Sequence, residues 1–88
     1  MIKTNFYGLQ KELALFERKT HFDKTPKSVL VRWLNTEIKH YKKSVRKQDI
    51  ENKLSDIIVL TLQIANREKI SLDKAWMDHW KRSQKYLK

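Results

Sequence analysis

The sequence contains no cysteine, one glycine (Gly8) and one proline (Pro26) in 88 residues. The absence of cysteine excludes disulfides and thiolate metal sites. Tight turns favour glycine and proline, so their scarcity argues against a β-rich fold and predicts a few long helices joined by short connections. No apolar run approaches the roughly 20 residues that span a bilayer, and the start MIKTNFYGLQKEL lacks the apolar core of a signal peptide. We therefore expect a cytoplasmic protein with no membrane partner.

Acidic residues are half as frequent as basic ones. The chain has 20 Lys and Arg against 10 Asp and Glu, which gives a formal net charge of +10. Such a surplus favours polyanionic partners: nucleic acid, a nucleotide or an acidic protein. The alternative interpretation is a lysine-rich solvated surface without a partner, because net charge by itself reports on solubility rather than function.

The length predicts a single domain covering residues 1–88. Apolar residues recur at helical spacing in four segments, approximately residues 4–19, 26–46, 50–67 and 72–86. Thr25, Asp49 and Ser71 are the expected N-caps of the last three helices. In residues 53–65 the abundance of Ile and Val leaves a β-strand as the rival interpretation, but the segment is long for a strand.

The faces of the predicted helices indicate which side chains form the core. In the first helix Phe6, Leu9, Leu13 and Phe16 form the apolar stripe, and the polar face includes Glu17. The third helix is apolar nearly all round, so we expect it to be buried on more than one side. In the fourth helix we expect Trp76 and Trp80 to lie in the core.

Two stretches carry a resemblance to a known family. DKTPKSVLVRWLNTEIKHYKKSV (residues 23–45) and KLSDIIVLTLQIANREKISLDKA (residues 53–75) resemble the second helix and the third and fourth helices of the MazG-like all-α nucleotide pyrophosphohydrolases. The resemblance implies an all-α, four-helix MazG-like bundle that is completed by oligomerisation. In that family, E-x-x-E and E-x-x-D motifs on two helices hold Mg²⁺, which assists hydrolysis of a nucleoside triphosphate to the monophosphate and pyrophosphate.

Carried over to this chain, the family's metal site is only half present. The resemblance places Glu37 and His40 on the first carboxylate pair, and Lys53 and Asp56 on the second. A register shifted by one residue would place Thr36 and Lys39 on the first pair instead. No catalytic residue is therefore assigned.

Lys53 decides between two interpretations of this site. An ammonium removes one ligand and repels a cation, so an ion pair from Lys53 to Asp56 or Glu37 would leave a vestigial metal site. We then expect no cofactor and little or no hydrolysis. In the alternative, an active pyrophosphohydrolase, Glu37 and Asp56 hold Mg²⁺ or Mn²⁺ and Lys53 binds phosphate. A reduced set of Glu37, His40 and Asp56 could also bind Mn²⁺, Zn²⁺ or Fe²⁺.

Candidate phosphate-binding or polyanion-binding residues form two sets. One is the basic end of the second helix, with Lys42, Lys43 and Arg46; the other is on the fourth helix, where the resemblance places His79 and Ser83 against the substrate phosphates, next to Arg82. The alternative for the first set is compensation of the helix dipole.

These observations support three hypotheses about function. The first is a degenerate MazG-like protein, suited to a phage or mobile element, that binds a nucleotide, nucleic acid or protein partner. The second is an active metal-dependent pyrophosphohydrolase with a remodelled site, and the third is a basic helical module that binds nucleic acid. In each case we expect a homodimer or higher oligomer, because one small bundle cannot cover the apolar third helix.

Overall fold

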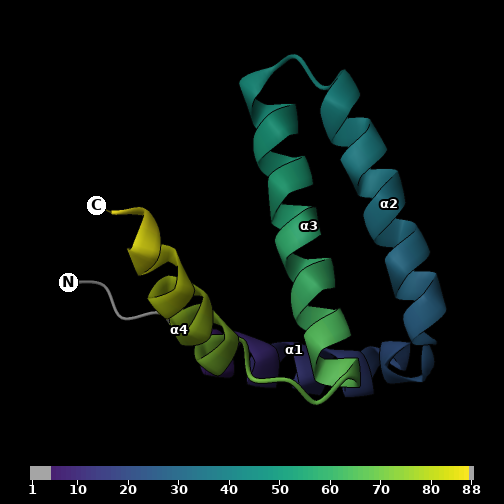
Figure 1. Cartoon of the computed structure of the whole chain (residues 1–88). Coiled ribbons are helices and arrows are strands. Elements are labelled where there is room, and N and C mark those ends of the chain that lie inside the picture. Colours follow the sequence, from purple (N-terminus) through teal and green to yellow (C-terminus); the bar gives the residue numbers. More distant parts are fainter. Residues whose placement is uncertain (1–4, 88) are drawn as a thin grey trace.

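The computed structural model describes residues 5–87, and within this range it contains four α-helices and no strand (Figure 1). In chain order the elements are α1 (Phe6–Thr20), the 3₁₀ turn η1 (Phe22–Lys24), α2 (Lys27–Lys43), α3 (Lys47–Arg67), α4 (Leu72–Ser83) and the 3₁₀ turn η2 (Gln84–Tyr86). The prediction of an all-α chain is confirmed, and residues 53–65 lie in α3 rather than in a strand. No helix in the described range is long and apolar enough to cross a membrane.

Side-chain caps fix the starts of α1 and α4. The Asn5 side chain accepts a hydrogen bond from the backbone N–H of Gly8 at 3.1 Å. The predicted start of this helix, Thr4, lies outside the described residues. At α4 the predicted cap is confirmed, since the Ser71 hydroxyl accepts from the backbone N–H of Lys74 at 3.3 Å. Each cap satisfies a backbone donor that has no partner inside its helix.

The predicted caps of α2 and α3 are wrong. Pro26 occupies the N-cap position of α2 without a side-chain bond, and Thr25 precedes it in the link from η1. Helix α3 begins at Lys47, so Asp49 lies inside its first turn, where it accepts from Arg46 Nε at 3.2 Å. The carboxylate still suits this place, because the helix dipole is positive at its start.

Helix α2 ends at Lys43, three residues before the predicted end. The Ser44 hydroxyl donates to the His40 carbonyl oxygen at 2.9 Å, and the Ser44 backbone turns to an extended conformation. This bond satisfies one of the carbonyls that the helix end leaves unpaired. The chain therefore reverses over residues 44–46, and α2 and α3 run side by side in opposite directions (Figure 1).

Helix α1 lies across the base of this hairpin, and α4 packs against α1 while leaning away from α2 and α3 (Figure 1). The buried apolar side chains therefore gather near the base of the hairpin: Leu30 of α2 and Leu60, Leu62 and Ala65 of α3. Among the described residues, the N-terminal half of α3, next to the 44–46 link, packs mainly against α2 (Figure 1). The expectation that α3 is buried on more than one side is met in its C-terminal half.

A buried ion pair, which the sequence did not indicate, joins α1 to α3. Glu17 is 1% exposed and accepts from both terminal nitrogens of Arg67, at 3.1 and 2.6 Å, and from Gln63 Nε2 at 3.3 Å. Arg67 also donates to the carbonyl oxygens of Phe22 and Thr25. The hydrogen bond with Glu17 raises the pKa of Arg67 above its usual value. Placing Glu17 on a polar face was therefore wrong, because this face of α1 meets the C-terminal end of α3.

The four helices form an open arrangement. The Cα radius of gyration is 14.9 Å, whereas a compact chain of this length has about 12 Å. The accessible surface is 7490 Å², against about 5500 Å² for a compact protein of this mass. Trp76 and Trp80, predicted to lie in the core, are 46% and 53% exposed, although Trp76 contacts Phe6 of α1 with the ring centroids 6.3 Å apart. The expected closed bundle is therefore not formed by a single chain.

Candidate functional site

The structure brings together the four side chains at the predicted metal-site positions. Lys53 Nζ lies 3.1 Å from Glu37 Oε2 and 3.8 Å from Asp56 Oδ2. His40 Nδ1 lies 3.9 Å from the same Glu37 oxygen. The ammonium therefore stands between the two carboxylates, with the imidazole at the edge of the group.

Helical spacing and the hairpin explain this convergence. Glu37 and His40 are three residues apart on α2, and Lys53 and Asp56 are three residues apart on α3, so each pair shares one helix face. The short 44–46 link sets α2 and α3 antiparallel, which places residues before the link opposite residues after it. Of the two registers considered for α2, the structure therefore agrees with the one that uses Glu37 and His40, because these residues and not Thr36 and Lys39 lie beside α3.

The electrostatics of the group centre on one oxygen atom. Glu37 Oε2 is shielded from solvent and makes no well-directed hydrogen bond with a described residue. Its negative charge is balanced by Lys53 at 3.1 Å, and the two side chains are 22% and 29% exposed. A shielded carboxylate without an opposite charge is costly, so Lys53 is the residue that allows Glu37 to lie between the helices.

This donor set does not fit a divalent cation. In the described range no three His, Asp or Glu side chains are arranged to hold a metal ion. A protonated lysine has no lone pair to offer, and its charge opposes a cation held by the same carboxylates. The arrangement can compensate charge and join α2 to α3, and no hydrolytic step through a metal is derived from it.

A basic hollow lies beside this group at the turn of the hairpin. Its volume is about 510 Å³, and its lining includes His40, Lys43, Arg46 and Lys53 as well as the acidic Asp49. Asp49 is paired with Arg46, whereas Lys43 has no salt bridge to a described residue. The hollow can therefore receive a small anion or a phosphate group beside several cationic side chains.

The predicted polyanion-binding residues do not form one patch. Lys43 and Arg46 line the basic hollow, whereas Lys42 is exposed outside it. His79 and Ser83 lie on α4, where their side chains are 3.4 Å apart, and His79 lines an apolar hollow beside Phe6 and Trp76. Arg82 is exposed on the same helix. Within one chain the α4 residues therefore do not share a pocket with Lys53.

Comparisons of the chain with protein-family models, curated proteins and solved structures give no significant match. The assignment of function therefore depends on the residues themselves.

Sequence reasoning missed two polar residues of the basic hollow, Asn52 and Ser44. Asn52 is three residues after Asp49 and so shares its helix face. The spacing of Asp49 and Asn52 could have indicated that both face the link, but only if both were known to lie inside α3. With α3 predicted to begin at Ile50, the link between the second and third helices was placed too late in the chain, since α3 begins at Lys47.

Proposed function

We propose that this chain is a non-hydrolysing relative of the MazG-like pyrophosphohydrolases, which acts as a homo-oligomer and binds a phosphate-bearing ligand, in the first instance a nucleotide. The observation that carries the proposal is the Lys53 ammonium, 3.1 Å from Glu37 and 3.8 Å from Asp56. In the enzymes that the sequence resembles, carboxylates at these places hold Mg²⁺. Here a fixed cation takes the place of an exchangeable one.

The loss of hydrolysis follows from what the metal supplies. A bound Mg²⁺ polarises the phosphoryl group, stabilises developing charge and orients water. An ammonium attached to the chain can attract phosphate, but it cannot hold and activate water as a multiply coordinated cation does. Lys53 therefore favours binding over turnover.

The basic hollow supports a phosphate-bearing ligand. Lys43 and Arg46 line it together with the half-buried Lys53. Arg presents a planar fork of donors that matches phosphate oxygens, and Lys contributes a compact charge. The hollow, of about 510 Å³, is of the size usual for small-ligand sites.

Restoring the carboxylates tests the metal half of the proposal. The double variant His40→Glu/Lys53→Glu would give the hairpin two acidic pairs, and we expect it to bind Mn²⁺ in calorimetry where the wild type does not. The control Lys47→Glu/Gln48→Glu changes the net charge by the same amount at exposed positions outside the hollow. Binding by the control or the wild type, or no binding by the restored variant, would count against a vestigial metal site.

Ligand binding is tested with ATP and inorganic triphosphate as probes. We expect Lys43→Glu/Arg46→Glu to weaken binding by at least about tenfold, since hydrogen bonds to charged groups contribute roughly 1.5–3 kcal/mol each. The charge-matched control Arg18→Glu/Lys19→Glu, at exposed positions of α1, should bind like the wild type. If both probes fail and duplex DNA binds with a steep dependence on salt, the nucleic-acid alternative replaces the nucleotide proposal.

A further inference from the structure

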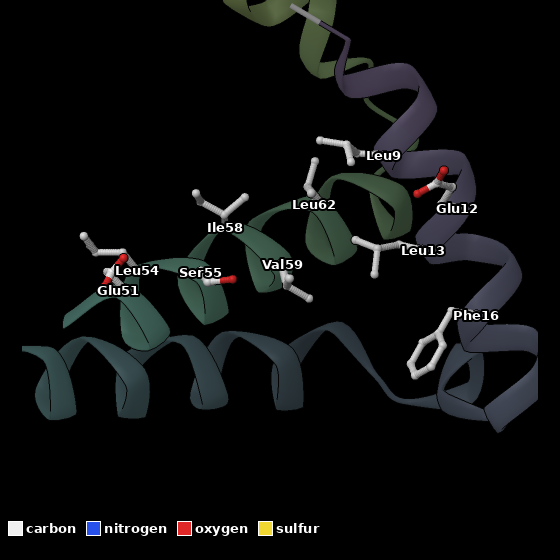
Figure 2. Close-up of a pocket in the computed structure, with 10 residues that line it drawn as sticks. All are labelled: Leu9, Glu12, Leu13, Phe16, Glu51, Leu54, Ser55, Ile58, Val59 and Leu62. Carbon is white, nitrogen blue, oxygen red and sulfur yellow. The ribbon is translucent and has the colours of Figure 1, made fainter. Parts of the chain in front are cut away.

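An apolar groove runs along α3 on the side that faces away from α2, and α1 crosses one end of it (Figure 2). Its volume is about 720 Å³. Apolar side chains of both helices form its walls: Leu9, Leu13 and Phe16 of α1, and Leu54, Ile58 and Leu62 of α3. We call it the α1–α3 groove. It shares no lining residue with the basic hollow at the hairpin turn.

Much of this apolar lining is open to solvent. Leu9, Phe16, Leu54 and Ile58 are each between 46% and 54% exposed. A contiguous apolar surface that is exposed to this degree usually marks a site of interaction. The groove is therefore examined for the form and the charge of an occupant.

The form of the α3 wall suits a second helix. Side chains line it in two rows with four residues between successive members: residues 51, 55 and 59, and residues 54, 58 and 62. Such rows are the ridges between which the side chains of another helix pack. From Glu51 to Leu62 the wall is about 16 Å long, or about three helical turns. Docking of an amphipathic helix in an apolar groove of this kind is a common mode of recognition.

The charge of the groove is opposite in sign to that of the chain. The chain has 20 Lys and Arg in 88 residues, but none of them lines the groove, where the charged residues are Glu12 and Glu51. Glu12 is on α1, and Glu51 is one turn into α3, near the hairpin turn, so the two carboxylates belong to opposite ends of the groove (Figure 2). An apolar floor with an acidic residue toward each end complements a helix that carries basic residues near both of its ends.

Both carboxylates are free to pair with a partner. Neither Glu12 nor Glu51 forms a salt bridge or a side-chain hydrogen bond with a described residue. Apart from Asp23, the other acidic residues in the described range are engaged: Asp73 accepts from the first N–H groups of α1, and the rest form salt bridges, namely Glu17, Glu37, Asp49, Asp56, Glu68 and Asp78. In a chain so rich in Lys and Arg, two unpaired carboxylates at one apolar groove indicate a basic occupant.

The same charges argue against a second copy laid groove against groove. That arrangement would bring the acidic residues of two identical grooves together, and like charges across an interface are unfavourable. For a basic helix, the positive charges elsewhere on the chain matter less than the two carboxylates, because salt at 0.1 M screens exposed charges beyond about 10 Å.

We propose that the α1–α3 groove binds an amphipathic helix of a partner protein. Apolar side chains of that helix pack against Leu54 and Ile58, and Lys or Arg side chains near its two ends pair with Glu12 and Glu51. The groove is a protein-binding surface separate from the basic hollow, so the inference goes beyond the proposed function and does not rest on it.

A pair of synthetic helical peptides tests the charge complementarity. Both have about four turns and a leucine stripe on one face; one carries two lysines at each end, and the other carries two glutamates there. In fluorescence anisotropy we expect the wild type to bind the lysine-ended peptide at least about tenfold more tightly. The double variant Glu12→Lys/Glu51→Lys should reverse this order, because two attractions of surface-pair strength become repulsions.

The control Glu68→Lys/Asp78→Lys makes the same change in net charge at exposed positions outside the groove. It should keep the wild-type order of the two peptides, which separates a local pairing from the field of the whole chain. A wild type that binds the glutamate-ended peptide more tightly, or a control that reverses the order as the groove variant does, would overturn the proposal.

The apolar contact is tested at the middle of the groove. We expect Ile58→Asp to weaken binding of the lysine-ended peptide by at least about tenfold, because a charge would be buried against the helix. Val45→Asp, at a position that is 87% exposed and outside the groove, should bind like the wild type. Equal binding by the two variants would contradict the docking site. A wild-type dimer that Ile58→Asp converts to a monomer in light scattering would place a second copy in the groove and would also overturn the proposal.

These results are distinguishable from those for the proposed ligand site. A chain that binds ATP but neither peptide would refute the docking site alone. A chain that binds the lysine-ended peptide but neither ATP nor triphosphate would refute the nucleotide proposal alone.

Discussion

Replacing Lys53 by Met is expected to destabilise the α2–α3 hairpin measurably. The substitution keeps the aliphatic stem and removes the ammonium that lies 3.1 Å from Glu37 Oε2. That oxygen is shielded from solvent and has no directed hydrogen bond within residues 5–87, so its charge would lose its compensation. Leaving such a group unpaired costs about 1–3 kcal/mol; because Glu37 keeps 22% of its side-chain surface in solvent, we expect the lower part, about 1–2 kcal/mol.

Urea denaturation followed by circular dichroism measures this loss. All variants are compared at one protein concentration, because the measured stability of any chain that self-associates depends on concentration. In a thermal scan the same loss corresponds to a fall in Tm of about 4–16 °C for a domain of this size.

A double-mutant cycle separates the ion pair from the change in packing. Glu37→Met/Lys53→Met removes both charges, and replacing both partners by apolar groups of similar shape is nearly neutral. We therefore expect the double variant to recover most of the stability that Lys53→Met loses. Lys27→Met is the matched control, since Lys27 and Glu68 are 3.0 Å apart but 50% and 44% exposed, and exposed pairs contribute about 0–1 kcal/mol. If Lys53→Met lowers the free energy of unfolding no more than Lys27→Met does, the claim that Lys53 compensates the charge of Glu37 is refuted.

Three further predictions concern the frame that holds the site. Arg67→Met should lower the free energy of unfolding in urea by about 3–5 kcal/mol, because Glu17 is 1% exposed and would lose its charge partner. Since the pKa of Arg67 is raised, Arg67 stays charged, and this loss should be the same from neutral to mildly alkaline pH. A loss that shrinks markedly over that range would contradict the role given to the ion pair. Leu30→Ala should cost about 2–5 kcal/mol by the same measurement, because Leu30 is 1% exposed; a loss below that of an exposed Leu15→Ala control would show that the base of the hairpin is not its core. Asp73→Ala should cost about 1 kcal/mol, as its carboxylate accepts from the first two N–H groups of α1 at 2.8 and 3.1 Å, and amide exchange of those two groups should quicken while the middle of α3 is unchanged.

Helix content and approximate limits could be predicted from the sequence because they depend on local patterns. The apolar stripe of residues 6–16, the Ser71 cap and the long apolar run of α3 each specify a helix without reference to the rest of the chain. The caps at Thr25 and Asp49 could not be predicted correctly, since Thr25 follows the η1 turn, and the α2–α3 reversal is set by the Ser44–His40 hydrogen bond.

The tertiary arrangement was harder to predict because it depends on which faces meet. Glu17 and Arg18 are neighbouring charged residues, and the sequence around them does not indicate that Glu17 is buried against Arg67 while Arg18 is exposed. Trp76 and Trp80 have the pattern of a buried face, but α4 leans away from α2 and α3, and both side chains stay about half exposed. The placement of Glu37, His40, Lys53 and Asp56 came from a family resemblance, and the hairpin brings these residues together.

The most direct test of the account is pyrophosphate release from a panel of NTPs and dNTPs by the wild-type protein with Mg²⁺ or Mn²⁺. With the Lys53 ammonium between Glu37 and Asp56, we predict no release above the background of a buffer control for any nucleotide. Release at ordinary enzyme rates that disappears in Asp56→Ala would contradict the account, since it would show that the two carboxylates still serve a metal.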